Sequence, residues 1–310
     1  MIPVIIYHCG GQSYLKAAIR MAEKNAEAFI LIGDEKNKDF SKNWVDMNSL
    51  DQSGYKEFER VYEHMSTHDK RIDLIIFKKY YIVRDYMRKN NIEKCFVLDA
   101  DVLLYESLSG FAFTETAYAA VSTPQNQSGY AWASSPHVSF WTYSAICDFT
   151  DYMIHVYRDH DSIYAKLKEK YNYQQEKGQL GGICDMTLLY LWSREREGVY
   201  NTCVNDNGTT FEHCITIPDN YLVGEYEMDT VLKIKKVSFV DNKPYLINNK
   251  GESVRTPMLH FQGEAKAFMQ YYLESKNPSH LKMTVVKKLY FVNRVWNKVI
   301  NILKDNMSGK

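Results

Sequence analysis

The sequence predicts an α/β fold with a mostly parallel central sheet flanked by helices. The chain opens with an apolar run at residues 2–7, a glycine turn, an amphipathic stretch and a second apolar run at 28–32. This strand–turn–helix–strand order is typical of the start of a parallel α/β sheet. Further short apolar runs then alternate with segments of helical periodicity.

Size and composition fit one catalytic domain, which we place at residues 1–280, followed by a tail at 281–310. The chain has 310 residues, of which 45% are hydrophobic and 25% charged, an ordinary globular composition. Lys plus Arg and Asp plus Glu both number 38. A global positive charge for nucleic acid is therefore absent, and we expect no nucleic-acid partner.

The elements follow in order from the periodicity. The strand at 2–7 ends at Cys9-Gly10-Gly11, a helix is expected at 15–24, and the strand at 28–32 ends at Gly33-Asp34. Apolar residues spaced by three and four predict a helix at 72–91. A strand at 95–98 then leads directly into Asp99-Ala100-Asp101.

The second half of the chain is less regular. Strands are expected at 118–122 and 138–141 and helices at 146–158 and 184–194, while the polar segment 162–177 is expected to be exposed. Short strands are expected across 231–256, with a hairpin turn at 248–251.

Cysteines and termini suggest a cytoplasmic protein. The six cysteines lie far apart, without the close spacing of a zinc or redox site, and read as buried free thiols. The first residues have no secretion-signal pattern, and no apolar stretch reaches the length of a spanning helix.

Asp99 and Asp101 are the main candidates for chemistry. In open α/β sheets ligands bind beyond the carboxyl ends of the strands, where this pair stands. Residues two apart on a strand face the same side, so both carboxylates can reach one divalent ion, which offsets their charge. The alternative is that they only cap a turn or a helix.

The apolar run, Asp-x-Asp and second apolar run resemble glycosyltransferases of the A-type fold (GT-A). In that fold the motif, here Asp99-Ala100-Asp101, holds Mn²⁺ or Mg²⁺ against the diphosphate of a nucleotide sugar. A later His-x-x-Gly-x-x-Lys, from His260 to Lys266, is similar to the signature of the retaining family that includes glycogenins and bacterial lipooligosaccharide galactosyltransferases.

This resemblance implies roles for the late motif. His260 is expected to be the third metal ligand beside Asp99 and Asp101, Gly263 to let the backbone approach the diphosphate, and Lys266 to neutralise a phosphate oxygen. Two carboxylates and an imidazole suit Mn²⁺. The alternatives are a structural histidine and a solvated lysine.

The resemblance also assigns donor-binding residues. The loop of Tyr7, His8 and Gly10 would hold the base and ribose, with a plain β–α turn as the alternative. On the helix before Asp99, Arg84 is the first candidate for a basic residue on the donor, with Lys79 second. Lys78 fits a solvated helix face.

Four residues are expected around the transferred sugar. Asp185 falls where family members bind sugar hydroxyls and is the candidate catalytic residue, with a helix N-terminal acid as the alternative. Met186 replaces the family's Gln, which puts in doubt a mechanism with that Gln as nucleophile. His137 and Ser139 are expected to line the sugar pocket.

The tail predicts a basic amphipathic helix, which would attach the protein to the inner face of an anionic membrane. A helix packed on the domain or on another subunit is the alternative. The apolar stripe consists of Val285, Val286, Leu289, Val292, Trp296, Val299, Ile300 and Leu303, and the basic residues are Lys287, Lys288, Arg294, Lys298 and Lys304.

Together these features predict a metal-dependent transferase. It would move a hexose from UDP-Gal or UDP-Glc onto a surface polysaccharide or lipid-linked oligosaccharide with retention. The acceptor would attack from the side of the leaving phosphate. The alternatives are a nucleotidyltransferase that makes nucleotide sugars, and an inactive glycan-binding relative.

Overall fold

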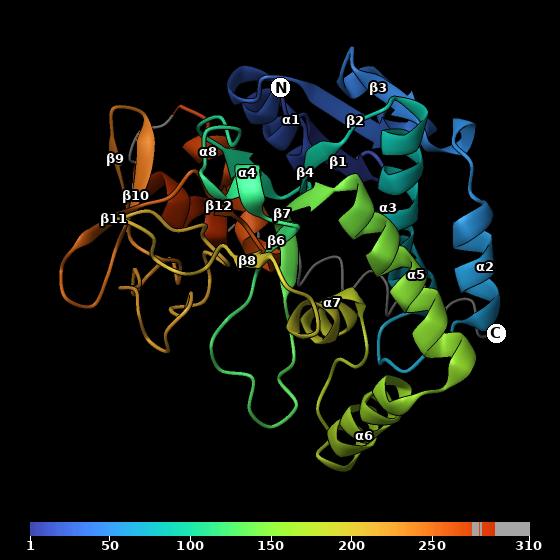
Figure 1. The fold of residues 1–310 in the computed structure, drawn as a ribbon. Helices are drawn as coiled ribbons and strands as arrows, with labels where there is room; N and C mark the ends of the chain where they lie inside the picture. The colour runs from blue at the N-terminus through green and yellow to red at the C-terminus, as the bar shows by residue number, and fades with distance from the viewer. Residues whose placement is uncertain (275–278, 280, 289–310) are drawn as a thin grey trace, which may run out of the picture.

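The computed structural model describes residues 1–274, 279 and 281–288, and its centre is a seven-stranded sheet (Figure 1). The strand order is β3-β2-β1-β4-β7-β6-β8. β3, β2, β1 and β4 run parallel, β7 is antiparallel to both neighbours, and β6 and β8 are parallel. The mostly parallel sheet is thus confirmed. The strands are β1 (Val4–His8), β2 (Phe29–Gly33), β3 (Trp44–Asp46), β4 (Lys94–Leu98), β6 (Ala119–Ser122), β7 (Ser135–Thr142) and β8 (Val199–Asn201).

Both faces of the sheet are covered, which is why its strands read as continuous apolar runs. Along β1, Val4 and Ile6 enter one hydrophobic cluster, whereas Ile5 and Tyr7 enter the other. Five helices contribute to the second cluster (Figure 1). These are α2 (Ser53–Val61), α3 (Lys70–Lys89), α5 (Tyr143–Asp159), α6 (Ser162–Glu176) and α7 (Asp185–Arg194).

The opposite face is covered by α1 near the N-terminus, by residues 102–117 and by much of the chain after residue 210. They surround two small sheets, one of β9, β10 and β11 and the other of β5 and β12. The helices of this side are α1 (Ser13–Asn25), α4 (Phe113–Thr116), η3 (Gly263–Phe268) and α8 (Met269–Tyr272). The strands are β5 (Val102–Leu104), β9 (Val237–Val240), β10 (Lys243–Ile247), β11 (Ser253–Arg255) and β12 (Met258–His260), and η1 (Glu35–Phe40) and η2 (Met47–Ser49) flank β3.

Helix α3 carries Lys79, which contacts Asp99. Its N-cap, Asp69, accepts a hydrogen bond from the backbone N–H of Arg71, and Arg88 and Lys89 stand in its last turn, where cations are favourable. Unlike a simple amphipathic helix, α3 also buries Asp73, Lys79 and Asp85. Buried charges need partners: Lys79 pairs with Asp99, Asp73 lies against His64 and His68, and Asp85 pairs with Arg84 and Arg88 of α3 itself.

Two expectations about the second half are settled by the structure. The hairpin turn at 248–251 joins β10 to β11 as expected. The segment 162–177 is not simply exposed, because it forms α6 and buries Ile163, Tyr164, Leu167 and Lys170. The Nζ atom of Lys170 donates to Thr187 Oγ1 at 2.7 Å and to the Trp132 carbonyl at 3.0 Å, while burial lowers the pKa of Lys170 to about 8.

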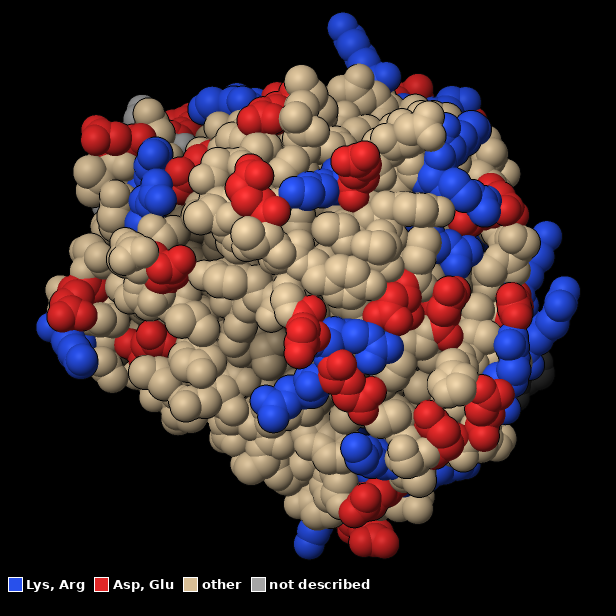
Figure 2. Space-filling model, viewed as in Figure 1, with Lys and Arg blue, Asp and Glu red and all other residues tan. Residues whose placement is uncertain are grey.

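The surface carries charges of both signs. On the face in Figure 2, basic and acidic side chains are interspersed rather than gathered by sign. All six cysteines are free thiols. Cys95, Cys203 and Cys214 are buried as expected, whereas Cys9, Cys147 and Cys184 are only partly buried. Within the described part of the chain, no helix is long and apolar enough to cross a membrane.

The first turns of the tail pack against the domain. Residues 281–288 are helical, with Met283 buried in the core and the Lys287 ammonium donating to the Val231 and Leu232 carbonyls at 2.9 and 3.0 Å. The rest of the predicted basic stripe, at 289–310, lies outside the described residues.

Candidate functional site

Asp99 and Asp101 stand in a turn between β4 and β5, not on a continuous strand as expected. The Val102 N–H donates to the Asp99 carbonyl at 3.2 Å, which closes the turn, and the Asp99 N–H donates to the His137 carbonyl at 2.8 Å. The chain turns here because β5 leaves the central sheet to pair with β12. The two carboxylates are nevertheless brought together.

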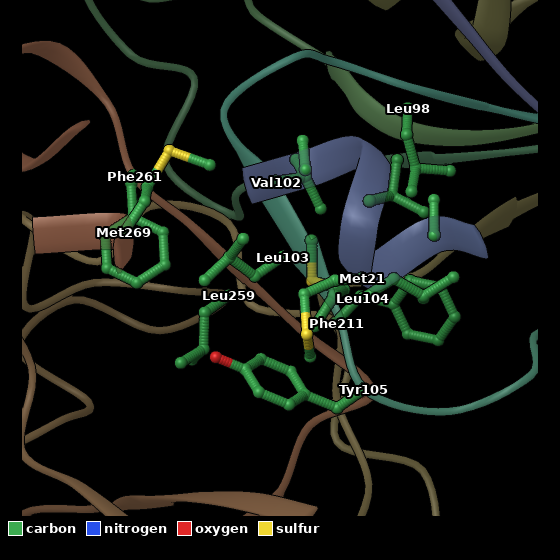
Figure 3. Packing of buried hydrophobic residues seen from close by; sticks show 14 of the residues in the cluster. Met21, Leu98, Val102, Leu103, Leu104, Tyr105, Phe211, Leu259, Phe261 and Met269 are labelled. Atoms are coloured by element: carbon green, nitrogen blue, oxygen red, sulfur yellow. The ribbon is translucent and has the colours of Figure 1, made fainter. Parts of the chain in front are cut away.

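The pairing of β5 with β12 brings His260 to this turn. The two short strands run antiparallel, with His260 opposite Val102 and Leu259 opposite Leu103. The Phe261 N–H extends the contact by donating to the Asp101 carbonyl at 2.9 Å. Figure 3 shows the apolar packing around this pair of strands, where Leu103 and Leu259 are fully buried.

The three predicted metal ligands converge. Atoms of Asp99, Asp101 and His260 that could bind an ion lie within 4.8 Å of one another, and His260 Nε2 is 3.3 Å from Asp101 Oδ1. His260 Nδ1 is 2.7 Å from the His213 carbonyl, which only accepts, so this nitrogen carries a proton. His260 Nε2 then faces a carboxylate, an arrangement that is favourable only with a proton or a cation between them.

These features fit a divalent ion. A metal-binding histidine usually donates its other ring N–H to a carbonyl or carboxylate, as His260 does. Two carboxylates and an imidazole are ligands suited to Mn²⁺.

Two lysines balance the acidic pair. Lys79 Nζ on α3 is 3.0 Å from Asp99 Oδ1, and Lys266 Nζ on η3 is 3.1 Å from Asp101 Oδ2. Burial alone would raise the pKa of Asp101, but His260 and Lys266 outweigh it and lower that pKa. Burial lowers the pKa of Lys79, but the neighbouring Asp99 and Asp185 carboxylates outweigh it and raise that pKa. Burial likewise lowers the pKa of Lys266, but Asp101 outweighs it and raises that pKa. Both lysines therefore remain cations at neutral pH.

Asp185 lies on the other side of Lys79, at the first residue of α7. Its Oδ2 accepts from the Tyr80 hydroxyl at 2.8 Å, and its Oδ1 from the Met186 N–H at 2.9 Å. Burial raises its pKa against the opposing effect of Lys79. Asp185 thus adds a third carboxylate to the site, and the positive charge of Lys79 acts on it as well as on Asp99.

These side chains open onto one cavity of about 430 Å³. Of the predicted residues, its wall contains Tyr7, His8, Lys79, Asp99, Ala100, Asp101, Asp185, Met186 and Lys266. His260 lies beneath Asp101, with its side chain only 3% exposed.

The structure does not bring every predicted residue to the cavity wall. Arg84 lies elsewhere on α3, where it donates to Thr150 Oγ1 at 3.0 Å. His137 and Ser139 are buried in β7 and do not line the cavity, contrary to expectation. His137 is hydrogen-bonded to Ser135 and the Glu212 carbonyl, and Ser139 accepts from the Trp141 indole N–H. Of the two basic candidates on α3, Lys79 is the one at the cavity.

The two predicted glycines also lie outside this wall, although both have backbone conformations that favour glycine. Gly10 has a φ of 105° and donates its N–H to Asp34 Oδ2 at 2.9 Å. Gly263 has a φ of 57° at the start of η3. Each allows a sharp turn next to a residue of the site.

The sequence analysis missed several residues of the cavity wall. Tyr14 on α1 is half-buried, and its ring lies 4.9 Å from Lys266 Nζ, whereas the ring of Tyr7 is mostly buried. One turn and two turns before Lys79, α3 presents three apolar side chains to the cavity. These are Ile72 and Ile75, which are exposed, and the partly buried Ile76. Their helical spacing of three, four and seven from Lys79 would have identified them.

Solved structures with a similar course of the chain include three glycosyltransferases. Apo xyloside xylosyltransferase 1 from mouse has a TM-score of 0.48 and 12% identity over 69% of this chain and 88% of that one. The galactosyltransferase LgtC in complex with donor and acceptor sugar analogs has a TM-score of 0.45 and 12% identity, over 93% of this chain and 95% of that one. A glycosyltransferase involved in glycosylating the major capsid of PBCV-1 has a TM-score of 0.39 and 10% identity, over 88% of this chain and 99% of that one.

No protein family and no curated protein matches the sequence.

Proposed function

We propose that the protein is a metal-dependent glycosyltransferase that moves a hexose from UDP-Gal or UDP-Glc onto a hydroxyl of a surface polysaccharide or lipid-linked oligosaccharide. One observation supports this most: Asp99, Asp101 and His260 converge beside a cavity that also presents Lys79, Lys266 and Asp185. Residues 99–101 and 260–266 are far apart in sequence, so their convergence is a property of the fold.

In the proposed reaction the donor diphosphate lies against Lys266 and the acidic pair. Mn²⁺ or Mg²⁺, held by Asp99, Asp101 and His260, would offset diphosphate charge as the C1–O bond breaks. Lys266 stabilises the negative charge that develops on the leaving phosphate. The half-buried ring of Tyr14, beside Lys266, is a better surface for the uracil than the mostly buried Tyr7.

The donor sugar is placed toward Lys79 and Asp185. Asp185 is held by Tyr80 and by the Met186 N–H, so its carboxylate is oriented to accept hydrogen bonds from sugar hydroxyls. A methionine at 186 offers no nucleophile. In the mechanism we propose, the acceptor hydroxyl therefore attacks C1 of the sugar from the side on which the phosphate leaves. The leaving phosphate accepts the proton of that hydroxyl, and the configuration at C1 is retained.

The test is a panel of UDP-sugars incubated with the full chain in Mn²⁺, in Mg²⁺ and in EDTA, with released UDP as the readout. We expect metal-dependent cleavage of UDP-Gal or UDP-Glc. Formation of a UDP-sugar from UTP and a sugar phosphate would instead indicate a nucleotidyltransferase. Binding of UDP-sugar without cleavage would indicate an inactive relative.

Location at the inner face of a membrane is a separate proposal, supported by the basic amphipathic pattern of the sequence after residue 288. Sedimentation with anionic vesicles tests it. The full chain should sediment with them at low salt and less so at high salt, whereas a chain ending at residue 288 should stay in solution. Equal sedimentation of both would contradict the proposal.

A further inference from the structure

The imidazole of His260 is held by buried groups that the proposed chemistry does not use. Its Nδ1–H donates to the His213 carbonyl, its backbone N–H donates to Glu212 Oε2 at 2.9 Å, and its carbonyl accepts from the Ile215 N–H at 3.0 Å. The segment 212–215 therefore lies along His260 and fixes its main chain.

Glu212 is the centre of this arrangement. Its side chain is fully buried and forms an ion pair with the equally buried Lys235, whose Nζ lies 2.9 Å from Glu212 Oε1. Lys235 Nζ also donates to the Asp219 carbonyl at 3.1 Å. A buried ion pair is costly to desolvate and is weak evidence for stability by itself, so its position against a candidate metal ligand calls for an explanation.

His137 completes the contacts around the ring. It stacks on His260 with ring centroids 4.5 Å apart and planes 7° from parallel. Its Nε2–H donates to the Glu212 carbonyl at 2.8 Å, and its Nδ1 accepts from the Ser135 hydroxyl at 2.9 Å. Burial, with the nearby His260 and His213, lowers the pKa of His137, so the stacked ring is neutral.

We propose that Glu212 and His137 are positioning residues that hold the His260 imidazole so that Nε2 points at Asp101, as a metal ligand must. Glu212 fixes the main chain of His260 through its carboxylate and fixes His137 through its carbonyl. His137 restricts rotation of the His260 ring, while the His213 carbonyl sets which nitrogen carries the proton. This inference rests on the proposed metal site, and it gives the buried Glu212–Lys235 pair a function.

A pair of matched double variants tests the role of Glu212. Glu212→Gln with Lys235→Met keeps an oxygen that can accept from the His260 N–H, whereas Glu212→Met with Lys235→Met does not. Both lack the buried charges, so they differ mainly in that one acceptor. The measurements are Mn²⁺ affinity of the metal-free full chain, from the electron paramagnetic resonance signal of free Mn²⁺, and thermal unfolding without metal.

We expect the Gln variant to bind Mn²⁺ within about threefold of the wild type, and the Met variant to bind roughly 10–100-fold more weakly, the usual effect of losing a group that orients a metal ligand. Equal Mn²⁺ affinity of the two variants would overturn the inference. Failure of the wild type to bind Mn²⁺, or unchanged affinity in Asp101→Asn, would instead contradict the metal site itself.

A second pair decides the matter should the Met variant not fold. His137→Phe keeps a flat ring against His260, and His137→Leu removes it, while both lose the same two hydrogen bonds. The Phe variant should bind Mn²⁺ more tightly than the Leu variant, by about tenfold. Equal affinities in this pair would show that stacking on His260 does not position it.

Discussion

The carboxylate of Asp101 contacts two residues of the late motif, His260 and Lys266. Asp101→Asn keeps the size of the side chain but removes its charge. We expect Mn²⁺ affinity to fall at least tenfold and sugar transfer about 100-fold or more, since ligand charge and the offset of diphosphate charge are both lost. Titration with Mn²⁺ and the rate of UDP release measure these effects. Asp39→Asn, at an exposed acid of η1, should behave as the wild type. Full activity in Asp101→Asn would contradict the proposed mechanism.

Lys79 neutralises negative charge on two carboxylates, since its ammonium contacts Asp99 and its positive charge also acts on Asp185. Lys79→Met removes this positive charge from the site, so we expect kcat for transfer to fall about 10–100-fold. The matched control is Lys78→Met on the same helix. Lys78 lies over the ring of Tyr55, 5.1 Å from its centroid, and is absent from the wall of the cavity. Steady-state kinetics with varied donor compare the two, and an equal loss in both would argue against the role of Lys79.

Which basic residue of α3 faces the cavity, Arg84 or Lys79, could not be predicted from the sequence. The two residues are five positions apart on α3, or about 140° around the helix, so only one can face the cavity. Apolar periodicity should reveal the phase of a helix, but α3 also buries Asp73, Lys79 and Asp85. A pattern that assigns charged residues to solvent therefore cannot tell that Lys79 is buried and reaches the site.

At the level of elements, the pairing of β5 with β12 decides the geometry of the site. Leu259, opposite Leu103, is fully buried in the core around this pair (Figure 3). Leu259→Ala should lower the free energy of unfolding by about 2–5 kcal/mol, because it removes buried apolar surface and leaves a cavity. Urea denaturation measures this loss. Val240→Ala, at a residue 54% exposed in β9, should change stability by at most about 0.5 kcal/mol. Equal effects would mean that Leu259 is not packed as described.

The elements that sequence analysis found and missed differ in length. The long helix at 72–91 and the strand at 95–98 correspond closely to α3 and β4, because the helix is long enough to show its period and the strand is a continuous apolar run between Lys94 and Asp99. β5 and β12 have three residues each, too few for any period to show. The candidate ligands were therefore identified one by one from motifs, whereas the turn and the strand pairing that join them required the structure.

At the scale of the whole molecule, the site joins segments from both sides of the central sheet. Lys79 and Asp185 come from helices of one side, while His260 and Lys266 come from the region of β12 and η3 on the other. Because residues from the two sides converge only in the folded chain, a ligand of this site binds the folded chain and not the unfolded one. Binding of Mn²⁺ should therefore raise the temperature of unfolding, by mass action.

The rise in unfolding temperature should depend on pH, because a proton and the metal compete for His260 Nε2. Burial lowers the pKa of His260, but Asp101 outweighs it and raises that pKa above its ordinary value. Without metal, the protonated His260 thus stabilises the fold at low pH, and this contribution is lost as pH rises through the raised pKa. With Mn²⁺ the dependence reverses, since the proton must leave before the metal binds. The difference in unfolding temperature between Mn²⁺ and EDTA should therefore be small near about pH 5.5 and grow toward about pH 8.

In His260→Gln, whose side chain has no proton to lose, the remaining difference in unfolding temperature between Mn²⁺ and EDTA should vary far less with pH. A Mn²⁺ effect of the wild type that stays constant over this range would show that His260 is not a ligand, even if Asp99 and Asp101 are.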